Sequence, residues 1–291
     1  MAGTPLQATL LVVVYTSDGY WIGADSARSS HGKRVETVCK VHETRFGLLL
    51  KSGASQGTTT AGETYSTDKE VETVLKVSTN AEEVKANLRS RFKEDIEEEL
   101  TYFVNDLAVG SHQKLGESPI PTPIPDPLIS ALQRTVLLFE PDAANRLGEV
   151  LHVVPRSDPW ADQITWPRMY RYWAPAILNW HPIDDLKPHT TDPSSGTTVT
   201  FPESVRMFGI PFQYTKPDEW VRSHPREALL DMLEEANRLE PEEVGPPYVI
   251  VHVTRGKGPA QQIQWIEKGP CPSWAEDTLP DDTLQELRNP Q

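Results

Sequence analysis

The segment from Thr9 to Gly53 constrains the fold more than any other part of the chain. It contains two apolar runs, Leu10–Tyr15 and Tyr20–Ala24, which are separated by Thr16-Ser17-Asp18-Gly19. An Asp-Gly pair between two apolar, β-rich runs is the strongest short-range signal for a hairpin. The sequence therefore predicts an antiparallel pair of strands near the start of the chain.

Four groups in this segment could converge on one point. Thr9 stands at the head of the first strand, Asp25 follows its hairpin partner, and Lys40 follows a cysteine. A third apolar run, Phe46–Leu50, leads into the small-residue turn Ser52-Gly53-Ala54. A hydroxyl, a carboxylate, a lysine and a backbone turn are together what a nucleophile needs for activation without a histidine.

Composition excludes several classes of function. The chain has 291 residues and a formal net charge of −14, which argues against sequence-independent binding of nucleic acid. No apolar run approaches the roughly 18–20 residues that span a bilayer. The run Leu10–Tyr15 is short and lacks a basic region before it, so it indicates a strand rather than a signal peptide. We expect neither a nucleic-acid nor a membrane partner.

The two cysteines, Cys39 and Cys271, are far apart and belong to no Cys-x-x-Cys motif. The sequence predicts that they form neither a zinc site nor a disulfide, and Cys39 is interpreted as a small buried apolar residue. A reducing, cytoplasmic location is the expectation, and an exported form whose signal has been removed stays open.

One long amphipathic helix is the clearest element downstream. Ser78-Thr79-Asn80 provides an N-cap, and acidic residues follow in the first turn. Apolar residues then recur at helical spacing as far as about Leu107. These residues are Val84, Leu88, Phe92, Ile96, Leu100, Phe103, Val104 and Leu107. We interpret this stripe as core rather than as a ligand site.

The remaining elements come in blocks of strands and helices. Strands are predicted at 132–140, 147–154, 197–201, 204–208, 248–254 and 262–266, and a helical region at 217–239. This order indicates an α+β fold of stacked layers with antiparallel sheets, not a βαβ pattern. The nucleotide motifs GxGxxG and GxxxxGK[ST] and the hydrolase motif GxSxG do not occur.

Several segments are expected to be irregular. Residues 29–37 are interpreted as a polar connection and residues 55–66 as a loop or a poorly formed helix start. Residues 1–269 are expected to form a single domain that contains a proline-rich connection at 110–127 and a tryptophan-rich insertion at 156–200, followed by an acidic tail at 270–291. The insertion is expected to pack its aromatic residues on the body or on a neighbouring subunit.

No metal or cofactor is expected. His181, Asp184, Asp185 and His189 could be drawn as a metal cluster, but their spacing fits no ligand motif. We interpret them as residues of a solvated loop.

From Thr9 to Gly53 the chain resembles the proteasome family of N-terminal-nucleophile (Ntn) hydrolases, and within it a bacterial proteasome-like group. The residues that carry the resemblance are Thr-Leu-Leu-Val, Asp-Gly, Ile-Gly-Ala-Asp-Ser-Ala-Arg, Cys-Lys-Val and Ser-Gly-Ala, in that order. Beyond Gly53 the resemblance is one of element order. It implies a four-layer αββα sandwich and a possible homo-oligomer.

The resemblance also implies a role for each of the four groups. Thr9 falls at the family's nucleophile, sixteen residues before Asp25, which is the family's own interval. Asp25 falls at the carboxylate that pairs with the catalytic lysine, Lys40 at that lysine, and Gly53 or Ala54 at the turn whose backbone N–H stabilises the oxyanion. The implied activity is that of a threonine-type peptidase or amidohydrolase acting on a peptide or amide substrate.

In such enzymes the general base is the nucleophile's own α-amine, whose ordinary pKa is near neutrality. Thr9 would acquire that amine when self-processing removes residues 1–8.

An alternative is a catalytically inactive proteasome-like subunit that acts as an assembly or interaction scaffold. The residue before Thr9 is Ala8, where the family usually has Gly. Gly209-Ile210-Pro211 stands where the family has a supporting serine, and Glu240–Pro247 stands where it has Asp-x-x-Ser-Gly. A small-molecule amidase of the same fold is a third interpretation.

Overall fold

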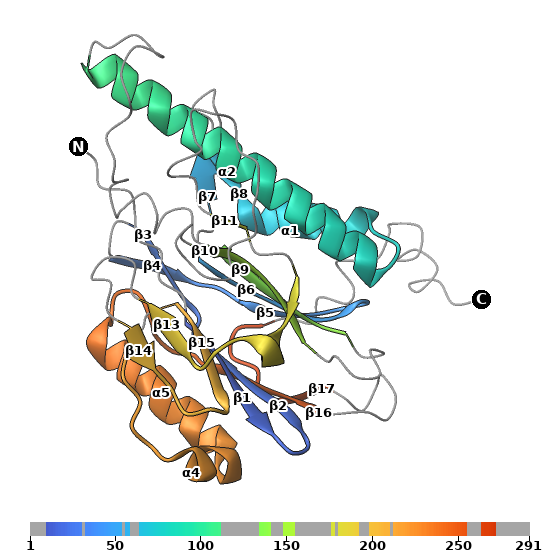
Figure 1. Ribbon diagram of the computed structural model, residues 1–291, viewed down its shortest axis with the longest axis vertical. Helices are drawn as coiled ribbons and strands as arrows, with labels where there is room; N and C mark the ends of the chain where they lie inside the picture. The colour runs from blue at the N-terminus through green and yellow to red at the C-terminus, as the bar shows by residue number, and fades with distance from the viewer. Residues whose placement is uncertain are drawn as a thin grey trace.

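Two antiparallel sheets lie face to face in the computed structural model, and helices cover their outer sides (Figure 1). The structure describes residues 10–30, 33–53, 56–58, 64–111, 134–140, 148–154, 176–177, 180–191, 198–209, 212–254 and 263–271. Thr9, most of the proline-rich connection, much of the insertion at 156–200 and residues 272–291 lie outside these ranges. The predictions made for them are therefore not addressed by the fold.

The first sheet has five strands in the order β15-β1-β2-β16-β17. These strands are β15 (Val205–Phe208), β1 (Leu11–Thr16), β2 (Gly19–Ala24), β16 (Val249–Thr254) and β17 (Ile263–Glu267). β1 and β2 form the predicted hairpin, paired from Leu11 opposite Ala24 to Thr16 opposite Gly19. Gly19 has a φ of +154°, and a Cβ there would lie 2.0 Å from the Val253 carbonyl oxygen. This turn therefore requires glycine.

The second sheet has six strands. Five follow the order β11-β10-β9-β6-β5, and β12 also pairs with β10. These strands are β11 (Ala176–Ile177), β10 (Glu149–Val154), β9 (Arg134–Phe139), β6 (Gly47–Gly53), β5 (Val41–Thr44) and β12 (His181–Pro182), and the 3-10 turn η2 (Ile183–Asp185) follows β12. β5 and β6 form a hairpin, in which Val41 lies opposite Leu50 and Thr44 opposite Gly47.

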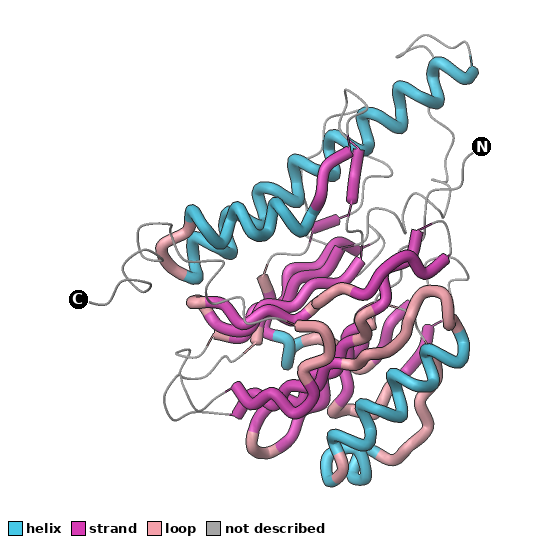
Figure 2. The backbone as a smooth tube through the Cα atoms, turned by 180° about the vertical axis from the view of Figure 1, so that it is seen from behind, coloured by secondary structure: helices cyan, strands magenta, loops and turns pink. Residues whose placement is uncertain are grey.

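Helices pack on the outer face of each sheet (Figure 2). On the six-stranded sheet lie α1 (Thr67–Val77) and α2 (Ala81–Ser111). On the five-stranded sheet lie α4 (Asp218–Ser223) and α5 (Pro225–Leu239), and α5 contacts β1 and β2. The helical region predicted at 217–239 is thus two helices, because Pro225 begins a new helix directly after His224.

The apolar core forms three clusters that alternate with these layers. One cluster joins α1 and α2 to the six-stranded sheet through Leu49 and Phe92, a second lies between the sheets around Leu48 and Leu50, and a third lies under α5. Adjacent residues of β6 therefore face opposite layers, as the pleat requires. A strand buried on both faces explains why these runs are continuously apolar.

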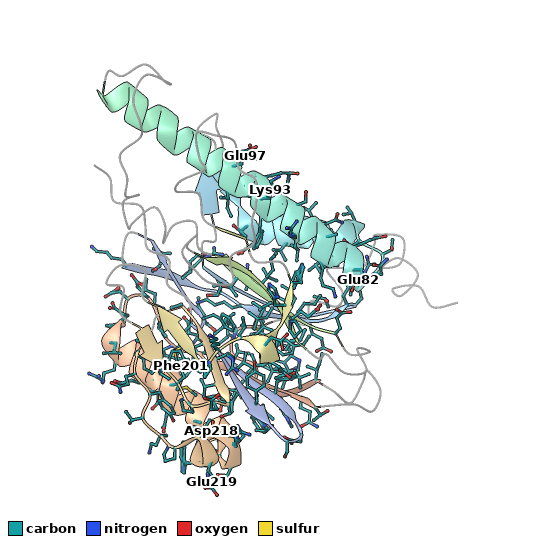
Figure 3. All side chains as sticks on the ribbon, viewed as in Figure 1. Glu82, Lys93, Glu97, Phe201, Asp218 and Glu219 are labelled. Atoms are coloured by element: carbon teal, nitrogen blue, oxygen red, sulfur yellow. A yellow bond between two sulfur atoms is a disulfide. The ribbon has the colours of Figure 1, made fainter. Side chains whose placement is uncertain are left out.

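The long helix confirms the predicted core stripe over the residues whose burial is described. Val84, Leu88, Phe92 and Ile96 are buried, whereas Glu82 and Lys93 are exposed and carried on the same helix (Figure 3). The predicted cap is present, because the Glu83 N–H donates to Asn80 Oδ1 at 2.9 Å. The helix runs to Ser111, a few residues beyond the predicted end.

Two segments expected to be irregular contain strands. Within the polar connection at 29–37, β3 (Ala27–Ser30) pairs with β4 (Lys33–Thr37). Within residues 55–66, β7 (Gln56–Thr58) pairs with β8 (Thr64–Ser66). A further pair joins β13 (His189–Thr191) to β14 (Thr198–Thr200). β4 is polar and mostly exposed, and the other strands of these pairs are only three or four residues long. They therefore lack the apolar alternation from which strands are predicted.

The expected mixture of helices with antiparallel sheets is confirmed by this architecture. Within the described residues, no helix is long and apolar enough to cross a membrane.

Candidate active site

Asp25 is the centre of the candidate site. It directly follows β2, and its side chain is fully buried. Its Oδ1 accepts a hydrogen bond from the Leu10 backbone N–H at 2.8 Å, and its Oδ2 accepts one from the Ala27 N–H at 2.9 Å. The carboxylate therefore fastens the start of β1 to the start of β3.

Lys40 is a third hydrogen-bond donor to this carboxylate. Its ammonium Nζ donates to Asp25 Oδ1 at 2.7 Å, and the residue is 4% exposed. Burial lowers the pKa of Lys40, the Asp25 carboxylate acts in the opposite direction, and the nearby charges of Arg28 and Arg34 add to the lowering. The predicted Asp25–Lys40 contact is thus present.

Strand β6 runs beside Lys40. The Lys51 backbone N–H donates to the Lys40 carbonyl oxygen at 3.1 Å, which sets the end of β6 against the lysine. Two residues later, Gly53 ends the strand with a φ of +94°. This left-handed backbone favours glycine, which explains why a glycine occupies the predicted oxyanion turn.

Thr9 and Ala54 lie outside the described residues, so their placement remains a prediction. Leu10 is nevertheless bonded to Thr9 through the amide whose N–H Asp25 accepts. The structure therefore brings together Asp25, Lys40, the end of β6 and the first residue after Thr9.

A second charged group, which the sequence interpretation missed, adjoins the site. The Lys51 ammonium contacts the Asp68 carboxylate on α1, and Asp68 also contacts Arg28, which pairs with Glu36. Burial, followed by the positive charges of Arg28 and Lys40, lowers the pKa of Lys51 to about 7. In the sequence, this cluster could have been suspected from Lys51, a charged residue that directly follows the apolar run Phe46–Leu50.

The connection from α5 to β16 lies beside the site. The Ser26 N–H donates to the Gly245 carbonyl oxygen at 3.2 Å, and the Arg34 N–H donates to a Glu242 carboxylate oxygen at 3.2 Å. Residues 240–247, which stand where the family has Asp-x-x-Ser-Gly, therefore lie next to Asp25. They contact Ser26 through the Gly245 carbonyl group and Arg34 through the Glu242 carboxylate.

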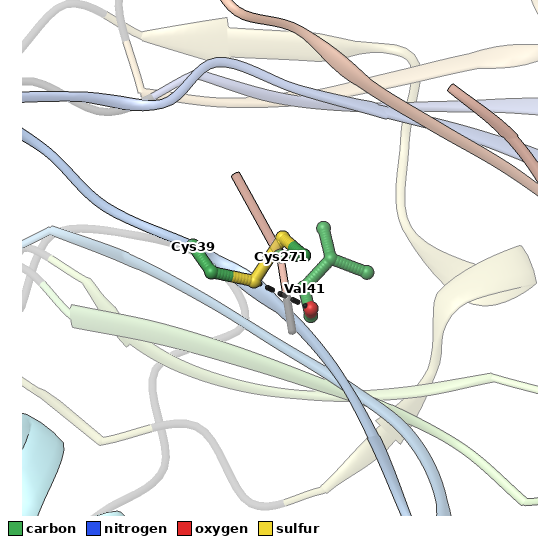
Figure 4. The surroundings of a disulfide bond; sticks show 3 residues. All are labelled: Cys39, Val41 and Cys271. Atoms are coloured by element: carbon green, nitrogen blue, oxygen red, sulfur yellow. Dashed lines mark hydrogen bonds between the residues drawn. A yellow bond between two sulfur atoms is a disulfide. The ribbon is translucent and has the colours of Figure 1, made fainter. Parts of the chain in front are cut away.

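The two cysteines form a disulfide, contrary to the sequence-based expectation (Figure 4). Cys39 and Cys271 are 232 residues apart, and their Cα atoms are 4.8 Å apart. The fold brings the segment before β5 and the segment after β17 together, which sequence spacing could not reveal. Cys39 Sγ also lies 2.9 Å from the Val41 carbonyl oxygen, a contact rather than a hydrogen bond because a disulfide sulfur carries no proton.

Asp184 belongs to the segment in which a metal cluster could be drawn from the sequence. Within the described part of the chain, no group of His, Cys, Asp or Glu residues could hold a metal ion. Asp184 instead accepts a hydrogen bond from the Tyr20 hydroxyl at 2.8 Å, which links this segment to β2.

Known protein structures include some to which this chain is similar. No family model matches the chain, and no curated protein matches it. Among solved structures, Anbu (ancestral beta-subunit) from Yersinia bercovieri aligns with a TM-score of 0.40 and 12% sequence identity. The alignment covers 90% of this chain and 88% of that one. A likeness of this size assigns neither fold family nor activity.

Proposed function

We propose that the protein is an Ntn-type, proteasome-like hydrolase that cleaves amide bonds with Thr9 as its nucleophile. The supporting observation is the chain of contacts from Leu10 through Asp25 to Lys40. Asp25 Oδ1 lies 2.8 Å from the Leu10 backbone nitrogen and 2.7 Å from Lys40 Nζ. A buried ammonium is therefore held beside the Leu10 N–H, which belongs to the peptide bond with Thr9. The αββα sandwich of Ntn hydrolases accommodates two face-to-face sheets with helices on both outer faces.

Activation begins with removal of residues 1–8. The Thr9 hydroxyl attacks the Ala8 carbonyl carbon, the Ala8–Thr9 C–N bond breaks, and an ester links Ala8 to Thr9 Oγ. Water then hydrolyses the ester, which releases residues 1–8 with a carboxylate at Ala8 and frees the Thr9 α-amine. This amine has an ordinary pKa near 7.7–8.0, so it can accept the hydroxyl proton at neutral pH.

Catalysis on a substrate follows the same steps. The α-amine takes the proton from Thr9 Oγ, which attacks the substrate carbonyl, and the acyl group is transferred to the hydroxyl as the amine product leaves. Lys40, held by Asp25, favours the deprotonated hydroxyl through its positive charge. A backbone N–H at the turn after β6 is suited to donate a hydrogen bond to the oxyanion. In comparable sites one such donor stabilises the transition state by ~3 kcal/mol.

A scaffold without catalysis is the second candidate, and one observation favours it. Asp25 already accepts two backbone hydrogen bonds in addition to the Lys40 ammonium, so the pair has a structural role that requires no chemistry. In that case Thr9 is an ordinary strand residue, and the chain serves as an assembly partner, for example in a homo-oligomer.

Intact-mass spectrometry separates the two candidates. The purified full chain is incubated at neutral pH, and its mass is followed over days. Loss of residues 1–8 in the wild type, together with a full-length Thr9→Ala variant, supports the hydrolase. Thr9→Ser is the matched control, because it keeps a hydroxyl and should still process. A wild-type chain that stays full length contradicts the proposal and supports the scaffold.

A further inference from the structure

The disulfide joins the edges of the two sheets. β17 is the last strand of the five-stranded sheet, and β5 is the last strand of the six-stranded sheet. Cys271 lies four residues after β17, and Cys39 lies two residues before β5. The bond therefore closes one side of the sandwich covalently. A hydrogen bond of 2.8 Å from Trp265 Nε1 to the Glu43 carboxylate joins the same two strands.

The segment that carries Cys39 also carries Lys40. Val38 donates its N–H to the Ser26 carbonyl oxygen at 2.8 Å, and Lys40 accepts from the Lys51 N–H at 3.1 Å. Residues 38–40 contain no strand of their own, so these two backbone hydrogen bonds, the Lys40 side-chain bond to Asp25 and the disulfide hold them in place. Cys39 is joined by one peptide bond to the lysine whose Nζ contacts Asp25.

We propose that the Cys39–Cys271 disulfide is a redox-controlled fastening that holds Lys40 against Asp25. When it is closed, the segment before β5 is fixed to the opposite sheet. When a dithiol reductant opens it, β17 and the segment 38–40 separate at this edge, and Lys40 becomes mobile. Cys39 is thus a positioning residue for Lys40. The consequence for catalysis depends on the proposed function, whereas the fastening itself does not.

The chemistry is an ordinary thiol–disulfide exchange. A thiolate of the reductant attacks one sulfur, a mixed disulfide forms, and the second thiol of the reductant then closes its own disulfide. Two electrons pass from the dithiol to the protein, which gains two thiols. Both cysteines are half-buried rather than enclosed, so a small dithiol can reach the bond.

Chemical labelling of lysine amines tests the fastening without depending on hydrolysis. The full chain is treated with acetic anhydride before and after reduction by dithiothreitol, and acetylation of each lysine is measured by peptide mass spectrometry. Lys40 should be protected in the oxidised protein, and its acetylation should rise on the order of tenfold or more after reduction, as local opening predicts. Thiol counting by alkylation establishes the redox state of each sample.

Two controls make the result specific. Lys85 is also buried but lies on α2 among glutamates, so its acetylation should not change. The variant Cys271→Ser, which leaves the residues around Lys40 intact, should behave as the reduced protein does. Trp265→Phe removes the hydrogen bond to Glu43 but keeps the disulfide, so it should behave as the oxidised protein does.

Three results would overturn the proposal. They are two free thiols in protein that was never reduced, unchanged Lys40 acetylation when both thiols are free, and an equal rise at Lys85, which would indicate general unfolding. In a chain that processes itself, reduction should also lower kcat for peptide hydrolysis and leave KM nearly constant. A chain that fails to process Thr9 but shows the Lys40 change refutes only the proposed function.

Discussion

Lys40 Nζ lies 2.7 Å from the same Asp25 oxygen that accepts the Leu10 N–H at 2.8 Å. One carboxylate oxygen thus links the start of the first strand to a buried lysine, although the lysine follows Asp25 by fifteen residues. Together with the Ala27 N–H at Oδ2, these hydrogen bonds give both oxygens of the buried Asp25 carboxylate a partner. They also place the lysine beside the backbone N–H of Leu10, the residue that follows Thr9 in the sequence.

The variant Asp25→Asn should unfold more easily and should not process. It keeps the shape of the side chain but leaves the Lys40 ammonium buried without its countercharge, and its amide group meets the Ala27 N–H donor-to-donor. Removal of one partner of a buried pair typically costs ~3–5 kcal/mol of the free energy of unfolding. Denaturant titration measures the loss, and intact mass measures processing.

The double variant Asp25→Asn/Lys40→Met is the control for this pair. It removes both charges, so it should recover part of the stability that the single variant loses, without restoring processing. If the double variant is destabilised by the sum of the two single losses, Asp25 and Lys40 are not energetically coupled, and the account of the pair is wrong.

His42 should make the stability depend on pH in acid. It is buried on β5, and burial, followed by the charge of Lys51, lowers its pKa from 6.5 to about 3. The unfolded chain therefore binds a proton that the folded chain does not, as the pH falls from about 6.5 to about 3. The free energy of unfolding should fall by up to ~1.4 kcal/mol per pH unit from this residue.

The variant His42→Leu should flatten that slope, and His224→Gln, at an exposed position, should leave it unchanged. The measurement is the denaturation midpoint at several pH values between 3 and 7. Equal slopes in the wild type and in His42→Leu would show that His42 does not stay neutral in the folded protein.

Gly19 should tolerate no side chain. With a φ of +154° and the Val253 carbonyl oxygen 2.0 Å from the position of a Cβ, Gly19→Ala must move the β2–β16 pairing as well as the turn. We expect a loss of ~2 kcal/mol or more in the free energy of unfolding. Ser17→Ala, in the same turn but exposed, should lose no more than about 0.5 kcal/mol. Similar losses in both variants would contradict this explanation.

Lys85 should stabilise the contact between α2 and the six-stranded sheet. Its ammonium contacts Glu82, Glu140 and Glu149 at 2.6–2.7 Å. Burial acts to lower the pKa of Lys85, but hydrogen bonds to these carboxylates outweigh burial, so the pKa is raised. Lys85→Met leaves Glu140 and Glu149 without their cation, so thermal unfolding should show a loss of ~2–4 kcal/mol.

Lys76→Met provides the comparison, because Lys76 pairs with Glu72 on the exposed side of α1. Its loss should stay below about 1 kcal/mol. Equal losses at the two lysines would mean that burial of Lys85 does not determine its contribution.

The sequence was sufficient for features that depend on local patterns. The Asp18-Gly19 turn, the cap at Asn80 and the apolar stripe of α2 each follow from neighbouring residues, and each is present. The Asp25–Lys40 contact was expected from a family resemblance rather than from pattern, and the geometry agrees with it.

Features that depend on distant segments could not be predicted. The Cys39–Cys271 bond exists because β5 and β17 are the edges of two different sheets that end side by side, and no spacing rule encodes that. The charged group around Lys51 likewise forms only when α1 brings Asp68 to the end of β6. The strands β4 and β7 escaped prediction because polar or small residues give no apolar alternation.

The most direct test of the account is covalent capture of Thr9. The matured chain is treated with a hydroxyl-directed β-lactone, digested, and searched by mass spectrometry for the adduct. The account predicts one adduct, on a peptide whose first residue is Thr9, and its loss in Lys40→Met. An absence of adduct on fully matured protein, or an adduct that forms equally well in Lys40→Met, would contradict the claim that Asp25 and Lys40 serve a Thr9 nucleophile.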